Sequence, residues 1–155
     1  MDKKSGYGFQ LVLNLLNQKA LPLIKQAAGE GYGIIARMPL QFGLLTGKFD
    51  AAVAFVESDH RHKRLTKEVI DKSNEALAPV WALCNKYECT KTQLALSYIL
   101  GYSEVSVVIP GIRTASHVTQ NTSGLFKLDD HDTGMIAELG ETVMNDVMEL
   151  IRKKG

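Results

Sequence analysis

Three short apolar segments, separated by helical patterns, are the feature that most constrains how this chain folds. They are residues 9–16 (FQLVLNLL), 31–38 (GYGIIARM) and 105–110 (VSVVIP), and each has the length and composition of a buried strand. Strands that alternate with helices indicate a parallel sheet, because parallel neighbours need a crossover connection. The sequence therefore predicts an α/β fold with about three parallel strands and flanking helices.

Helical periodicity fills most of the chain between and after these segments. Pro79 is expected to kink or divide the longest helix, because proline cannot donate to the helical ladder. The stretch 90–93 (TKTQ) has the pattern of a capping box, and Asp129 is the expected N-cap of the last helix. Helices are predicted over 19–30, 66–87, Thr90 to Leu100 with Gly101 as C-cap, from about 115, and from Asp129 to Ile151.

The connection between the second strand and the long helix, residues 39–65, is rich in glycine, phenylalanine and charge. Connections of this length are uncommon and more often have a function, such as ligand binding, than serve only to join two elements. The run 59–64 (DHRHKR) includes two histidines, but beyond Asp59 it has no cysteine or carboxylate at the usual ligand spacing. We therefore expect a solvated loop here and no metal site.

Composition and charge exclude several classes of protein. A chain of 155 residues suits one domain, and its net charge of +1 gives no overall field that attracts nucleic acid or an anionic membrane. No apolar run reaches the roughly 18 residues of a transmembrane helix, and the first residues lack a signal-peptide pattern. Cys84 and Cys89 form neither a metal motif nor a redox motif. We expect a cytoplasmic protein with no nucleic-acid or membrane partner.

The stretch 108–121 (VIPGIRTASHVTQN) runs from a strand into a helix through a Gly-Ile-Arg-Thr turn. A helix start presents free N–H groups and partial positive charge, which suits a phosphate. Arg113 adds a full positive charge just before the cap residue Thr114. Taken alone, these residues favour a capped surface helix with one exposed arginine, and an anion-binding turn is the alternative.

Five stretches together resemble the aldo-keto reductases, over about residues 9–145. The first two resemble the sixth barrel strand of that family and its seventh strand with the phosphate-clamping loop. The next two resemble the family's Asp-x-Arg loop insertion and its Thr-x-x-Gln helix, and the last resembles the eighth strand with its cofactor-binding turn. In order, the stretches are QLVLNLLNQKALPLI, GYGIIARMPLQFGLLTGKF, DHR at 59–61, TKTQLALSYIL and VIPGIRTASHVTQN.

The resemblance implies the C-terminal part of a (β/α)₈ TIM barrel. Residues 1–155 would form a single incomplete aldo-keto reductase domain, with barrel strands six to eight and the C-terminal helices. The family's catalytic Asp, Tyr, Lys and His lie on earlier strands, so no catalytic residue is assigned here. We therefore expect an NADP-dependent oxidoreductase fragment that lacks the catalytic tetrad and is inactive alone.

The resemblance also implies NADPH as the cofactor. Gln10 would hydrogen-bond the nicotinamide carboxamide, and Arg37 would stack on the nicotinamide ring. Lys48 would pair with phosphate, and Arg113 would face the adenosine 2′-phosphate with His117 nearby. The residues expected to bind the cofactor are Gln10, Arg37, Leu40, Gly43, Leu44, Thr46, Lys48, Gly111, Arg113, His117, Gln120 and Asn121, the last two at the adenine edge.

Two alternatives stay open at this point. The chain could be a non-catalytic module that binds a nucleotide or a protein partner, or an inactive truncated gene product. Open sheet edges invite pairing, so the expected partners are a complementary N-terminal half-barrel or a second copy of the chain. Binding of NADPH without turnover of an aldehyde would favour the module, and absence of both would favour the truncated product.

Overall fold

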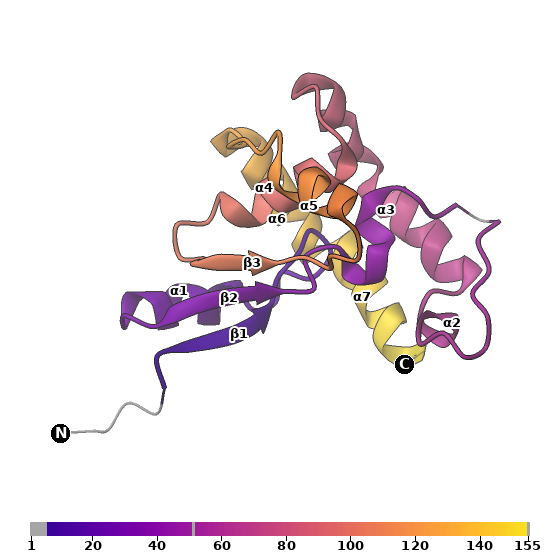
Figure 1. Ribbon diagram of the computed structural model, residues 1–155, viewed down its shortest axis with the longest axis horizontal. Helices are drawn as coiled ribbons and strands as arrows, with labels where there is room; N and C mark the ends of the chain where they lie inside the picture. The colour runs from indigo at the N-terminus through magenta and orange to yellow at the C-terminus, as the bar shows by residue number, and fades with distance from the viewer. Residues whose placement is uncertain (1–5, 51, 155) are drawn as a thin grey trace.

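The structure is a computed structural model that describes residues 6–50 and 52–154 and is built around a three-stranded sheet (Figure 1). The strands β1 (Gly8–Val12), β2 (Gly33–Arg37) and β3 (Val107–Ile109) are parallel and lie in the order β1-β2-β3. Helix α1 (Leu21–Gly29) connects the first two strands, and a long helical region connects β2 to β3. The predicted α/β fold with three parallel strands is confirmed.

The helices between β2 and β3 and those after β3 follow each other in the predicted order, but there are more of them than the sequence predicted. The Thr90 side chain accepts from the Gln93 N–H, and the Gln93 side chain accepts from the Thr90 N–H, which confirms the capping box. Asp129 accepts from the Asp132 N–H as the N-cap of the sixth helix. The remaining elements are the 3₁₀ helix η1 (Gln41–Thr46), α2 (Arg61–Arg64), α3 (Lys67–Lys86), α4 (Lys91–Leu100), α5 (Ala115–Thr122), α6 (Asp130–Glu141) and α7 (Val143–Lys154).

The first strand is shorter than predicted. It ends at Val12 rather than at residue 16, because the buried Asn14 side chain redirects the backbone. The Asn14 Oδ1 atom accepts hydrogen bonds from the N–H groups of Leu16 and Asn17, at 3.0 and 2.9 Å. Leu13, Leu15 and Leu16, which follow the strand, are fully buried. The strand itself is exposed or half-buried, with Phe9 40% exposed, so the prediction of a buried strand is wrong for residues 9–12.

Two predictions about helix boundaries are also wrong in part. Pro79 lies inside α3 and does not divide it. The single last helix is two helices, because Thr142 leaves the helical region with φ −114° and ψ −109°, and its hydroxyl donates to the Glu138 carbonyl. The break redirects α7, which packs along α3 beside α6 (Figure 1).

The two faces of the sheet differ. Ile34 and Ala36 of β2 are fully buried with α1, whose Ile24 and Ala27 belong to the same core. Side chains alternate along a strand, so Ile35 lies on the other face, in register with Gln10 of β1 and Val107 of β3. On that face Ile35, Val107 and Ile109 are 37%, 44% and 43% exposed. The described residues therefore leave one apolar face of the sheet open.

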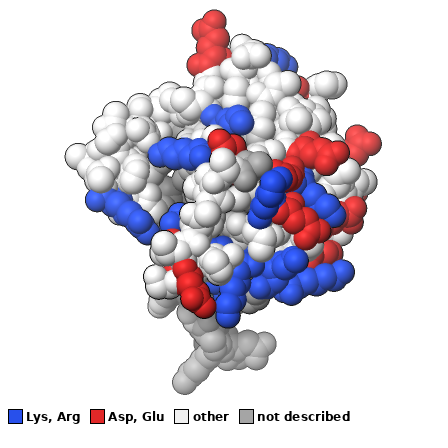
Figure 2. Space-filling view, turned by 90° about the vertical axis from the view of Figure 1, so that its right-hand side faces the viewer, with Lys and Arg blue, Asp and Glu red and all other residues white. Residues whose placement is uncertain are grey.

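Charge is distributed over the surface without a dominant sign. Figure 2 shows basic and acidic side chains interspersed on the face that lies to the right in Figure 1. No helix in the described ranges is both long and apolar enough to cross a membrane. Cys84 and Cys89 are free thiols, and burial raises the pKa of the Cys89 thiol to about 11. That thiol is therefore protonated and unreactive at neutral pH.

Candidate cofactor site

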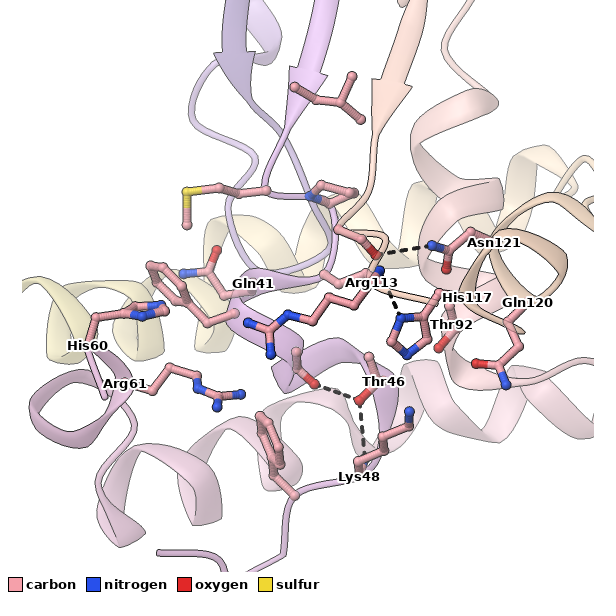
Figure 3. Close-up of a pocket in the computed structure, with 18 residues that line it drawn as sticks. Gln41, Thr46, Lys48, His60, Arg61, Thr92, Arg113, His117, Gln120 and Asn121 are labelled. Atoms are coloured by element: carbon pink, nitrogen blue, oxygen red, sulfur yellow. Dashed lines mark hydrogen bonds between the residues drawn. The ribbon is translucent and has the colours of Figure 1, made fainter. Parts of the chain in front are cut away.

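A cavity of about 500 Å³ opens where β2 and β3 end. Figure 1 shows the arrowheads of the strands pointing toward η1 and α5, which flank this region. Eighteen residues line the cavity (Figure 3). Most belong to two segments, which we call the loop wall (residues 38–49) and the helix wall (residues 109–121). The carboxyl ends of parallel strands are where α/β proteins bind ligands, so this is the position expected for a site.

The loop wall has an unusual backbone that a distant side chain supports. Met38, Gln41 and Phe42 have positive φ angles of 55°, 43° and 59°, a region that residues other than glycine rarely adopt. The Asn14 Nδ2 atom donates to the Met38 carbonyl at 2.9 Å and to the Gln41 Oε1 atom at 2.8 Å. Because Asn14 and Gln41 are both buried, these bonds hold the end of β2 against the end of β1.

The helix wall is built from local interactions. The Thr114 hydroxyl accepts from the His117 N–H at 3.3 Å and caps α5. The Arg113 N–H donates to the His117 Nδ1 atom at 3.2 Å, and Asn121 donates to the Gly111 carbonyl at 3.4 Å. These bonds fix the turn that leads from β3 into α5, and Figure 3 shows the Arg113 guanidinium extending into the cavity.

The side chains that line the cavity make it cationic. Lys48, Arg61 and Arg113 contribute to its lining, and among the described lining residues there is no aspartate or glutamate. Neither the Lys48 ammonium nor the Arg113 guanidinium has a carboxylate partner within the described parts of the chain. Arg61 is paired with Asp59, whose carboxylate lies 2.6 Å from the Arg61 Nη2 atom. Two unpaired positive charges in a concave site favour an anionic ligand.

The structure brings most of the residues expected to bind the cofactor to this one cavity and places three elsewhere. The Leu44 side chain is buried in the core beneath η1. Gln10 and Arg37 lie on the open face of the sheet, because Arg37 is in register with Val12, two residues beyond Gln10. Their contacts with a cofactor stay predictions. The expected residues that line the cavity are Leu40, Gly43, Thr46, Lys48, Gly111, Arg113, His117, Gln120 and Asn121.

Several lining residues were not identified from the sequence. His60 is 59% exposed at its side chain, as a solvated loop would have it, but Arg61 is only 26% exposed and packs on Phe55, so the loop prediction is wrong for Arg61. The Asp-x-Arg spacing was a usable signal, because it permits a bidentate pair. Thr92 enters the lining as the second residue of α4, inside the capping box formed by Thr90 and Gln93. The others are Met38, Pro39, Gln41, Phe42, Phe49 and Ile109.

The fold is a parallel α/β sheet with a cationic cavity at the carboxyl ends of its strands, which is the position where α/β proteins generally bind their ligands. The sequence profile of the Aldo/keto reductase family matches residues 8–141. The chain therefore belongs to the aldo/keto reductase family, as the five motifs indicated.

Curated relatives give the same result. The chain is 30% identical over 125 residues to a probable aldo-keto reductase 1 from Glycine max, and 26% identical over 138 residues to an NADH-specific methylglyoxal reductase from Escherichia coli. These matches cover 79% and 87% of this chain but 35% and 41% of the relatives. The chain thus spans about two fifths of the length of the relatives that it matches.

Solved structures confirm the fold. A glycerol dehydrogenase from Gluconobacter oxydans superposes with a TM-score of 0.71 at 22% identity, over 84% of this chain and 41% of that structure. An aldo-keto reductase from Bacillus halodurans superposes with a TM-score of 0.64 at 15% identity, over 88% of this chain and 43% of that structure. The three strands and their helices therefore correspond to the C-terminal part of a (β/α)₈ barrel.

Proposed function

We propose that this chain is the cofactor-binding part of an NADPH-dependent aldo-keto reductase, and that residues 1–155 form one incomplete domain of that kind. The observation that carries the proposal is the cationic cavity at the carboxyl end of the sheet, which Lys48 and Arg113 line and to which no aspartate or glutamate of residues 6–50 and 52–154 contributes. The phosphate groups of a dinucleotide supply the complementary negative charge. A nicotinamide cofactor would bring the hydride chemistry, and the chain would bind and orient it.

The open face of the sheet supports an extended dinucleotide site. Ile109 lines the cavity, and it is also in register with Arg37 on the open face. A ligand whose phosphates occupy the cavity can therefore extend along β2 toward Arg37 and Gln10. In our proposal the Gln10 amide binds the nicotinamide carboxamide and the planar Arg37 guanidinium stacks on the ring.

The helix wall supports NADPH over NADH. Arg113 extends into the cavity beside the start of α5, where free N–H groups favour a phosphate. Only NADPH carries the additional 2′-phosphate that such an arrangement would bind. Relatives of this chain are named for either cofactor: one from Schizosaccharomyces pombe is an aldo-keto reductase with NADP(+) in its name, whereas the Escherichia coli relative is NADH-specific.

The open apolar face also supports the proposal that catalysis requires a complementary segment. Ile35, Val107 and Ile109 are exposed where a closed barrel would cover them, and β1 and β3 have unpaired edges in the described sheet. We propose that a complementary half-barrel covers this face and provides the catalytic tetrad. The chain alone would then bind NADPH without reducing a carbonyl compound.

The test measures the dissociation constants of the purified chain for NADPH and for NADH by isothermal titration calorimetry. The Arg113→Ala variant is expected to lose affinity for NADPH by roughly tenfold or more and to leave NADH binding unchanged, because one charge-assisted phosphate contact is lost. Arg152→Ala is the control, since Arg152 lies on α7 and pairs with Glu149. If Arg113→Ala binds NADPH as well as the control does, the assigned role of Arg113 is wrong. Reduction of an aldehyde by the chain alone would refute the requirement for a complementary segment.

A further inference from the structure

A pair of thiols at the end of α3 lies outside the cavity, and the proposed function gives it no role. Cys84 is in the last turn of α3, and Cys89 is in the short connection to α4. Neither residue is part of the cavity lining. Their separation in the sequence matches no redox motif, so contact between the two thiols depends on the way in which α3 ends.

The end of α3 brings the two cysteines together. Tyr87 is the C-cap residue, and Glu88 after it has a φ of 49°, in the left-handed region. The Cys89 N–H then donates to the Cys84 carbonyl at 3.0 Å. Such a bond, closed across a left-handed residue, is the main bond of a Schellman motif. The side chains at the two bonded positions of this motif commonly contact each other, and here they are the two thiols.

The contact between the thiols is suited to a disulfide. A disulfide forms without backbone movement only where two cysteine Cβ atoms are close and directed toward each other. The Cys89 thiol donates a hydrogen bond to the Cys84 sulfur, so the two sulfur atoms already face each other. Both side chains pack against the core but are only partly buried, so a small oxidant can reach them.

Burial, hydrogen bonding and charge make the two thiols unequal. Burial raises the pKa of the Cys84 thiol, whereas the hydrogen bond from Cys89 and the charge of Lys91 oppose this rise. Lys91 is the first residue of α4. Burial raises the pKa of the Cys89 thiol to about 11, and the neighbouring Cys84 adds to that rise. Because the thiolate is the nucleophile, Cys84 is the thiol that reacts first, and Cys89 is the one that follows.

We propose that Cys84 and Cys89 form a reversible intrachain disulfide when the chain meets a disulfide oxidant such as oxidised glutathione. The Cys84 thiolate attacks one sulfur of the oxidant, whose S–S bond breaks and releases a first glutathione. The Cys89 sulfur gives up its proton and attacks the Cys84 sulfur of the mixed disulfide, which releases the second glutathione. The cysteine pair loses two electrons, oxidised glutathione gains them, and the two thiol protons end on the two released glutathione molecules.

The disulfide closes a ring over residues 84–89 and holds Glu88 in its left-handed conformation. Glycine is the usual residue at this position, because a side chain disfavours that conformation. A disulfide also removes conformational freedom from the unfolded chain. The oxidised chain should therefore unfold at a temperature higher by roughly 5 °C than the reduced chain, and addition of a reductant should reverse the shift.

Mass spectrometry identifies the product without ambiguity, because Cys84 and Cys89 are the two cysteines of the chain. The folded, reduced chain is incubated with oxidised glutathione for hours, since exchange is slow where the thiols are mainly protonated. The expected product is a monomer lighter by two hydrogen atoms, whose sulfurs resist alkylation until a reductant is added. Two free thiols, a stable glutathione adduct or a disulfide-linked dimer would overturn the proposal.

Single variants test the order of the two steps. Cys89→Ser keeps a hydroxyl that can donate to Cys84 but has no second thiol, so it should accumulate a glutathione adduct at Cys84. Cys84→Ser is the matched control, and its adduct at Cys89 should form several-fold more slowly. An equal or faster reaction of Cys84→Ser would show that the assigned order is wrong. Circular dichroism confirms that each variant is folded.

The unfolded chain tests whether the end of α3 favours the disulfide. The equilibrium constant for its formation against glutathione is measured for the folded chain and for the chain in urea. The folded chain should give a value larger by roughly tenfold or more, because the Schellman motif already holds the sulfurs together. Equal values would show that the thiols are only an apolar contact at a helix end, and the proposal would be wrong. Neither measurement uses a nucleotide, so its result is independent of the proposed cofactor binding.

Discussion

The loop wall and the helix wall enclose the same cavity but are stabilised in different ways. The helix wall depends on interactions between residues that are close in the sequence, with Thr114 as the cap of α5. The loop wall depends on Asn14, which lies 24 residues before Met38 and 27 before Gln41. The loop wall also contains positive φ angles at Met38, Gln41 and Phe42, whereas the described helix wall has none.

This difference indicates how each wall should respond to mutation. A residue other than glycine in the left-handed region costs about 1 kcal/mol or more, so the loop wall keeps its shape only because tertiary contacts stabilise it. The helix wall carries no such cost, and its local cap contributes modestly. We therefore expect substitutions that support the loop wall to cost more stability than substitutions that support the helix wall.

The largest effect is expected for Asn14→Ala. The buried Asn14 amide makes two donor and two acceptor bonds, and its loss leaves the buried Gln41 side chain without its partner. The free energy of unfolding, measured by urea denaturation, should fall by roughly 3 kcal/mol. Asn17→Ala is the control, and it should cost less than about 0.5 kcal/mol because no side-chain bond of Asn17 is present in the described structure. Equal losses in the two variants would contradict the role assigned to Asn14.

Asn14 also shows why part of the fold was not predictable from the sequence. The apolar run 9–16 includes the core residues Leu13, Leu15 and Leu16, but it could not show that the strand before them is exposed or that a buried asparagine turns the chain after Val12. The break at Thr142 was also not predictable, because the stripe of apolar residues continues from α6 into α7 without interruption. Where signals are local, as at Thr90 and Asp129, the predicted caps agree with the structure.

The candidate site was also predictable only where its structure depends on residues that are close in the sequence. Motif spacing placed the Arg113–His117 turn correctly at a strand end, and the structure brings it together with Lys48. The backbone of the loop wall could not be predicted, because positive φ angles at Met38 and Phe42 follow from tertiary contacts and not from residue type. Arg61 was missed because its aromatic support comes from Phe49 and Phe55, and only the folded loop brings these rings to it.

An intermediate effect is expected for Gly43→Ala in the loop wall. Gly43 has a φ of 93°, and an added Cβ would lie 3.2 Å from the Phe49 ring. Thermal or urea unfolding should show a loss of about 1 to 2 kcal/mol. Gly134→Ala is the matched control. Gly134 is inside α6, and apart from its chain neighbours and the backbone of its own helix no atom would lie within 4 Å of the added Cβ, so the same change should stabilise the chain by up to about 1 kcal/mol. A neutral Gly43→Ala variant would show that the loop wall tolerates a different backbone.

The smallest effect is expected for Thr114→Ala in the helix wall. The substitution removes the hydroxyl that accepts the His117 N–H, and loss of an N-cap costs about 1 kcal/mol. Thr119→Ala in the same helix is the control, since Thr119 is exposed and its hydroxyl makes no bond to any described residue. Urea denaturation of the two variants gives the difference directly. A cost for Thr114→Ala as large as that for Asn14→Ala would contradict the comparison, because it would show that the helix wall also depends on more than its local cap.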